Sequence, residues 1–174
     1  MLPEALQTTE FYSILTVLVA LVIQYQRTIS WSEYRTIHAL KRGVLPLIDH
    51  YTTFFVVSRK GGREDGEYVA TVDKTVRATF KALNNDGFSP HLINSIKQRP
   101  HPADGKPQYS DAHLVKFHND GYQSEIYLFG MGGETDVYAH VETDVKDPEG
   151  HLFETDQQDG DVRNVLPKWV TKDS

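Results

Sequence analysis

The chain has 174 residues, 39% of them apolar and 24% charged, which suits one folded domain with an appendage rather than a disordered chain. It contains no cysteine, which excludes disulfides, a cysteine nucleophile, thiolate zinc sites and iron–sulfur clusters. The net charge of −6 argues against a general nucleic-acid binder, because such a protein needs a basic face.

Charge is unevenly distributed along the chain. Residues 27–106 carry 13 Lys and Arg against 8 Asp and Glu, whereas residues 134–174 carry 4 against 11. A basic segment beside an anionic bilayer, with an acidic face directed away from it, is one arrangement consistent with this pattern. Two unrelated solvated surfaces are the other.

An uncharged apolar segment, FYSILTVLVALVIQY at 11–25, is the strongest signal in the sequence. No polar stripe recurs along it with a helical period, so a helix here must be surrounded by lipid or by protein. Residues 6–29 together reach the length that a bilayer requires. A membrane helix, a helix buried in the core or between subunits, and a buried strand are the interpretations left open. The predicted membrane or interface anchor residues are Phe11, Ile14, Leu15, Leu18, Leu21, Val22, Tyr25 and Trp31.

Basic residues follow the apolar segment but do not precede it, and a secretory signal peptide is therefore not expected. Arg27, Arg35, Lys41 and Arg42 all lie on its C-terminal side. If the segment spans a membrane, this bias predicts a main domain on the cytoplasmic or interior side.

A second, short amphipathic helix is predicted after the apolar segment. Ser30 and Glu33 have the spacing of a capping box, and Lys41 and Arg42 suit the last helical turn. Gly43 is expected to end this helix, and Pro46 marks residues 44–48 as a connector.

The rest of the chain predicts an α+β fold with a mainly antiparallel sheet of about five strands packed by one helix. Alternation and turn residues indicate the strands, and a 3.6-residue apolar period indicates the helix. The expected strands are 51–58, 91–99, 112–118, 124–129 and 136–145, the helix is 71–85, and turns or loops are expected at 60–66, 100–107, 119–121 and 130–133.

Four regions follow from these elements: an anchor or interface helix, an amphipathic helix with its connector, the α+β domain and an acidic tail. Their expected ranges are 1–29, 30–50, 51–145 and 146–174. Scattered apolar residues suggest that the tail packs onto the domain in places, namely Leu152, Phe153, Val162, Val165, Leu166 and Trp169.

None of the histidines or acidic runs in the sequence predicts a metal or a cofactor. His113 and His118 share a strand, yet a spacing of five directs them to opposite faces. His101 and Asp104 suit an exposed loop. The acidic run 156–161 lacks the ligand pattern of a calcium loop.

The glycine and aromatic patterns favour structural roles over nucleotide binding or catalysis. The glycines at 130–133 fit a hairpin turn better than a dinucleotide fingerprint, because no helix is expected after them. Tyr127, Tyr138, His140 and Glu142 are expected to share one face of the sheet, and a polar, solvent-facing surface is the interpretation favoured for it. No catalytic residue is predicted.

These features favour a non-catalytic, membrane-anchored structural or adaptor protein, one form of which is a minor virion protein. The first alternative is a soluble subunit of a ring, tail or neck assembly that buries the apolar helix between subunits. The second alternative is an enzyme with a site of histidines and carboxylates on the sheet. The expected partners are a lipid membrane or neighbouring protein subunits, as part of a larger assembly and without nucleic acid.

Overall fold

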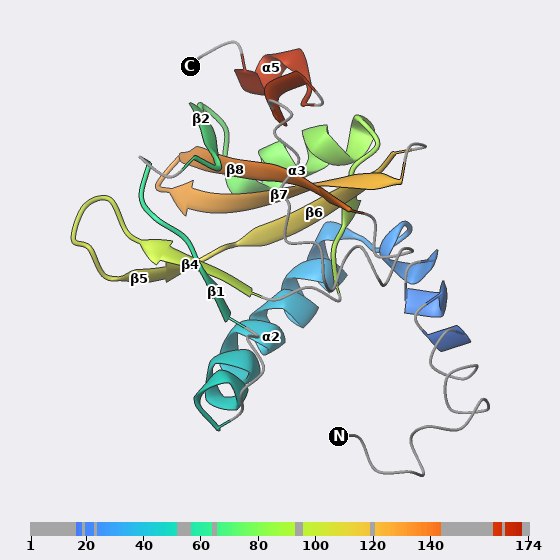
Figure 1. Cartoon of the computed structure of the whole chain (residues 1–174), viewed down its shortest axis with the longest axis horizontal. Helices are drawn as coiled ribbons and strands as arrows, with labels where there is room; N and C mark the ends of the chain where they lie inside the picture. The colour runs from blue at the N-terminus through green and yellow to red at the C-terminus, as the bar shows by residue number, and fades with distance from the viewer. Residues whose placement is uncertain are drawn as a thin grey trace.

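A five-stranded antiparallel sheet lies at the centre of the molecule, beside a three-stranded sheet and several helices (Figure 1). The computed structural model describes residues 17–18, 20–22, 24–51, 57–63, 66–92, 96–118, 121–143, 162–164 and 166–171. The predicted α+β class, with a mainly antiparallel sheet of about five strands packed by a helix, is confirmed. The elements are α2 (Trp31–Tyr51), β1 (Val57–Arg59), β2 (Tyr68–Val72), α3 (Val76–Asn85), β3 (Ser89–Pro90), β4 (Ile96–Pro100), β5 (Pro107–Tyr109), β6 (Ala112–Phe117), β7 (Tyr122–Met131), β8 (Glu134–Thr143), η2 (Val162–Asn164) and α5 (Lys168–Thr171).

The large sheet has the strand order β2-β8-β7-β6-β3. β7 and β8 are joined by a two-residue turn, since Met131 pairs with Glu134, and this confirms the predicted hairpin. Gly132 has a φ of 78° in this turn, a backbone conformation that glycine adopts without strain. Because side chains alternate along each strand, β6, β7 and β8 present one apolar and one polar face.

Helix α3 covers the apolar face of the large sheet, and α5 lies on the same side (Figure 1). Thr75 caps the N-terminus of α3 by accepting a hydrogen bond from the Ala78 N–H at 3.4 Å. Each fully buried apolar side chain contributes about 1.5–3 kcal/mol to folding. The main core between helices and sheet includes Tyr34, Phe80, Leu83, Phe88, Leu114, Ile126, Leu128, Val137 and Val170, each at most 3% exposed.

The three-stranded sheet, β1-β4-β5, packs across the polar face of the large sheet. Strand β4 pairs with β1 in parallel and with β5 in antiparallel orientation. The chain continues from β5 to β6 through Ser110 and Asp111, whose N–H groups donate to the carbonyls of Lys97 at 2.8 Å and Leu128 at 2.7 Å. The two sheets are therefore joined at this corner.

Helix α2 begins with the predicted capping box. The Ser30 N–H donates to Glu33 Oε2 at 2.8 Å, and the Glu33 N–H donates back to Ser30 Oγ at 3.4 Å. The Ser30 hydroxyl also donates to Glu33 Oε2 at 2.5 Å, and this bond, with the one from the Ser30 N–H, lowers the pKa of Glu33. One turn later the Tyr34 hydroxyl accepts from the His113 N–H at 2.7 Å, which ties α2 to strand β6.

Two predictions about the end of this helix are wrong. Gly43 does not end α2, and Pro46 lies inside the helix rather than in a connector. Gly43 lacks the positive φ of a helix-terminating glycine. The second half of α2 packs against β1 and β4, and Asp49 Oδ1 accepts from the Val57 N–H at 3.2 Å. Tertiary packing thus overrides local propensity here.

Several predicted boundaries also change. The predicted helix 71–85 begins only at Val76, because its first two residues belong to β2 and pair with β8. The end of the predicted strand 91–99 belongs to β4, whereas β3 lies before this range and β5 is not among the predicted strands. Of the predicted strand 51–58, residues 52–56 lie outside the described part, and β1 covers its end.

The predicted acidic tail returns to the domain at its described end. Leu166 and Val170 are buried in the main core. Trp169 Nε1 donates to Asp86 Oδ2 at 2.7 Å, and Lys74 Nζ lies 4.9 Å from the centre of the Trp169 ring. Leu152, Phe153 and Val165 lie outside the described residues.

Candidate functional site

Ionisable side chains gather on the polar face of the large sheet, where three strands bring them into register. His113 of β6, Tyr127 of β7 and Tyr138 of β8 form one row across the sheet. In neighbouring rows of the same face, Glu125 lies opposite His140, and Gln123 lies opposite Glu142. The expectation that Tyr127, Tyr138, His140 and Glu142 share one face is therefore confirmed by the register.

The polar face does not point to solvent, and this part of the prediction is wrong. Glu125 is 1% exposed, and Tyr127 and Tyr138 are fully buried. Strand β4 covers them, with Lys97 Nζ 4.8 Å from the centre of the Tyr127 ring and Arg99 Nη1 3.0 Å from the Tyr138 hydroxyl. Because the three-stranded sheet, here called the covering sheet, lies over these side chains, the polar face forms a buried polar layer between the two sheets.

His91, His113 and Glu125 form the deepest part of this layer, which we call the His–Glu cluster. Glu125 Oε1 lies 3.2 Å from His91 Nδ1, and Glu125 Oε2 lies 3.1 Å from His113 Nε2. Burial lowers the pKa of His113 to about 3, although the Glu125 carboxylate opposes this shift. Burial raises the pKa of Glu125, but His113 and His91 outweigh it and hold that pKa well below its usual range. Neutral imidazole and ionised carboxylate are the forms that bind metals.

His140 lies next to the His–Glu cluster and has several partners. Its ring contacts the Tyr127 hydroxyl, its Nε2 lies 3.2 Å from Glu142 Oε2, and its Nδ1 lies 3.4 Å from Glu67 Oε1. Burial lowers the pKa of His140, but the carboxylates of Glu142, Glu67 and Glu125 raise it to about 9. At neutral pH His140 is therefore a cation held among carboxylates.

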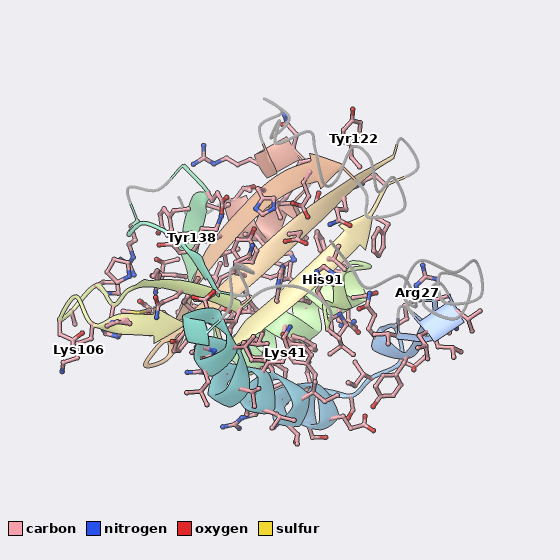
Figure 2. All side chains as sticks on the ribbon, turned by 60° about the horizontal axis from the view of Figure 1, so that its bottom comes forward. Arg27, Lys41, His91, Lys106, Tyr122 and Tyr138 are labelled. Carbon is pink, nitrogen blue, oxygen red and sulfur yellow. The ribbon has the colours of Figure 1, made fainter. Side chains whose placement is uncertain are left out.

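Three lysines border the same layer (Figure 2, in which Lys41 of α2 and His91 are labelled). Lys60 Nζ lies 2.6 Å from Glu67 Oε1, and Lys41 Nζ donates to the Leu92 carbonyl at 3.0 Å. Burial lowers the pKa of Lys41 to about 8 and also lowers the pKa of Lys97. Strongly shifted groups in one place are a feature of functional sites, although buried ion-pair networks share it.

A second buried ion pair lies further along the same interface between the sheets. Asp136 of β8 accepts hydrogen bonds from Arg99, Arg63 and Thr71. Arg99 is 1% exposed, and its guanidinium lies 4.4 Å from the centre of the Phe129 ring. Burial raises the pKa of Asp136, but the hydrogen bonds from Arg63, Thr71 and Arg99 outweigh it and lower the pKa. This pair joins the two sheets.

The predicted anchor residues lie mostly at the surface where the structure describes them. Leu18, Leu21 and Tyr25 are 53%, 61% and 46% exposed. Val22 is half-buried, and Trp31 packs against Phe80 with ring centres 4.7 Å apart. Phe11, Ile14 and Leu15 lie outside the described residues. In the described part of the chain, no helix is both long enough and apolar enough to cross a membrane.

The other sequence candidates stay outside the buried polar layer. His118 Nε2 bonds to Ser124 Oγ at 2.7 Å, whereas His113 faces Glu125, so the two histidines do not converge. His101 Nδ1 lies 3.6 Å from Asp104 Oδ1 in the loop between β4 and β5. The acidic run 156–161 lies outside the described residues.

Sequence reasoning missed His91, Glu125 and Lys97. Glu125 had a usable signal, since it alternates with Tyr127 on a predicted strand and therefore lies on the same face. Lys97 and Arg99 are also two residues apart, a spacing that places two side chains on the same face of a strand. His91 had no such signal, because it follows the short strand β3 and reaches the cluster only through the fold.

Comparison with known proteins adds no family to this description: no family model, curated protein or solved structure matches the chain.

Proposed function

We propose that this chain is a non-catalytic structural or adaptor protein that is anchored to a lipid membrane by its N-terminal helix. One observation supports this most strongly. The exposed large hydrophobic side chains of the described residues all lie on two helical segments, within 17–25 and on α2. They are Val17, Leu18, Leu21 and Tyr25, and then Leu40, Val44, Leu47 and Ile48.

The spacing of these residues makes each set a continuous stripe. Leu18, Leu21 and Tyr25 recur at three and four residues, as do Leu40, Val44 and Leu47, so each set lies on one helix face. Both helical segments lie below the large sheet in Figure 1, on the opposite side of the picture from α5. Contiguous exposed apolar surface of this kind is typical of membrane or protein contact sites.

Lipid is the favoured partner because of what surrounds the first stripe. The segment 11–25 that contains it is uncharged, and the exposed Arg27 follows it directly. An apolar helix with a flanking cation suits an anionic bilayer surface. The bias of basic residues toward the C-terminal side supports a main domain on the cytoplasmic or interior side.

A soluble assembly is the second candidate, and the stripe on α2 favours it. Leu40 and Leu47 are 68% and 63% exposed, yet they belong to the folded domain rather than to the N-terminal segment. A neighbouring subunit would cover them as well as lipid does. A minor virion protein would combine a membrane anchor with a subunit contact, because its helix would lie in a membrane and its domain would contact coat subunits.

The proposed role is non-catalytic because the ionisable layer is closed. Glu125 and His113 are each 1% exposed, so the deepest ionisable groups lie away from solvent. An enzyme with a site at His140 and Glu142 would instead lose a measurable activity when either residue is changed.

Vesicle flotation of the full-length protein tests the proposal. Wild type should float with vesicles of phosphatidylcholine and phosphatidylglycerol, and less well with phosphatidylcholine alone. Leu18→Glu/Leu21→Glu should abolish flotation without unfolding the domain, because both side chains are already exposed. The matched control, Leu40→Glu/Leu47→Glu, changes the second stripe by the same chemistry and should still float. If wild type does not float with either kind of vesicle but forms a defined oligomer, and the Leu40→Glu/Leu47→Glu variant disrupts that oligomer, the soluble assembly is favoured.

A further inference from the structure

We propose that His91, His113 and Glu125 bind one divalent transition-metal ion of the zinc class between the two sheets. This site is independent of the membrane anchor. The three side chains come from the segment after β3, from β6 and from β7, so a bound ion would join three parts of the chain. Two imidazoles and one carboxylate form a donor set that zinc accepts in proteins.

The distances suit a metal centre. One imidazole nitrogen from each histidine and a Glu125 oxygen lie within 4.8 Å of one another. With bonds of about 2.0–2.1 Å, neighbouring donors of a tetrahedral zinc site lie roughly 3.3 Å apart. His91 Nδ1 lies 3.2 Å from Glu125 Oε1, and His113 Nε2 lies 3.1 Å from Glu125 Oε2, so each histidine faces a different carboxylate oxygen at about this spacing.

Hydrogen bonding alone does not satisfy the His–Glu cluster. His91 is 5% exposed, and its Nδ1 has no aligned hydrogen-bond partner although the Glu125 carboxylate lies 3.2 Å away. A buried polar atom without a partner destabilises the folded protein. A cation between His91 Nδ1 and the Glu125 carboxylate would accept a lone pair from the nitrogen and one from a carboxylate oxygen.

A neighbouring group, Glu125 with His140 and Glu142, has donor atoms equally close together. It is a weaker candidate because both nitrogens of His140 already have partners, in Glu142, Glu67 and Tyr127. The contrast with His91 assigns the ion to the His–Glu cluster. His140 and Glu142 are 10% and 28% exposed at the side chain, so they lie nearer to solvent than the proposed ligands.

The formal charge around the cluster is close to balance. Lys41, Lys60, Lys97 and the protonated His140 give four positive charges, against three negative charges on Glu67, Glu125 and Glu142. Without an ion, the lysines and histidines alone neutralise Glu125. That metal-free network is the competing explanation, and it predicts no stoichiometric metal binding.

Cobalt titration of the full-length, chelator-treated protein tests the site. Wild type should take up one Co²⁺ per chain with visible d–d absorption, and Zn²⁺ should displace it. His113→Gln and Glu125→Gln should each weaken Co²⁺ binding by about 100-fold or more. The matched control, His118→Gln, removes a histidine next to the same strand and should bind as wild type does.

Two further measurements keep the test decisive if the buried variants do not fold. X-ray absorption of the zinc-loaded wild type should show two imidazole ligands. His140→Gln should retain one metal per chain. Wild type that binds no stoichiometric metal would overturn the proposal. So would a His113→Gln variant that folds and binds normally, or loss of binding only in His140→Gln.

Discussion

Arg99 of β4 and Asp136 of β8 lie on different sheets, and their charged groups meet 2.7 Å apart with both side chains fully buried. Asp136 also accepts from Arg63 Nη2 at 2.7 Å, so two cations share one carboxylate. The pair is surrounded by the rings of Phe129 and Tyr138. It therefore links the covering sheet to the large sheet at a point closed to water.

Replacing Arg99 should destabilise the protein strongly. Arg99→Met leaves the buried Asp136 with only the partly exposed Arg63 as a cation, and breaking such a pair costs about 3–5 kcal/mol. Arg42→Met is the control, because the Arg42–Asp111 pair is more than one-third exposed at each side chain, and a loss below about 1 kcal/mol is expected. Urea unfolding measures both, and equal losses would show that the Arg99 pair does not hold the sheets together.

Tyr34 should stabilise the edge of the large sheet through its hydroxyl. β3 ends at Pro90, and beyond it the Tyr34 hydroxyl accepts the hydrogen bond from the His113 N–H that a strand would otherwise accept. Tyr34→Phe should cost about 1–3 kcal/mol, because a buried N–H loses its acceptor. Hydrogen exchange at the His113 amide should accelerate in the variant. Tyr122→Phe, at a partly exposed position on β7, should change neither quantity, and an unchanged His113 amide in Tyr34→Phe would contradict the assignment.

His38 should make the stability depend on pH. Burial lowers its pKa from 6.5 to about 4, opposed by the Ser110 carbonyl and Asp111 and supported by Lys41 and Arg42. The unfolded chain therefore binds more protons than the folded one between these values, so this stability is present above pH 6.5 and is lost as pH falls toward about 4.

The His38→Gln variant isolates this effect. Between about pH 7 and about pH 5, wild type should lose roughly 2 kcal/mol more than the variant in urea unfolding. Other buried ionisable groups titrate in both proteins and cancel in the comparison. Equal losses in the two proteins would mean that His38 does not change its pKa on folding.

The sequence predicted the central strands well because their signals are local. Alternation along β6, β7 and β8 and the glycines at 132–133 specify strands, faces and hairpin without reference to the rest of the chain. The same alternation correctly grouped Tyr127, Tyr138, His140 and Glu142.

The burial of that face could not be predicted, because it depends on a sheet with little local signal. β1 and β5 have three residues each, and Pro100 and Pro107 lie opposite each other at one end of the pairing between β4 and β5. In the sequence alone, short strands and prolines are typical of loops. The closed polar layer, and with it the position of His91 next to Glu125, arises only when this sheet packs across the large one.

Fractionation of the full-length protein by high salt, alkaline carbonate and detergent tests the proposed anchor most directly. The membrane-anchored account predicts that the protein stays with the membrane pellet in salt and carbonate and is released only by detergent. Release by salt alone, or a soluble oligomer before any extraction, would contradict it and would make the stripes at 17–25 and on α2 contacts between subunits.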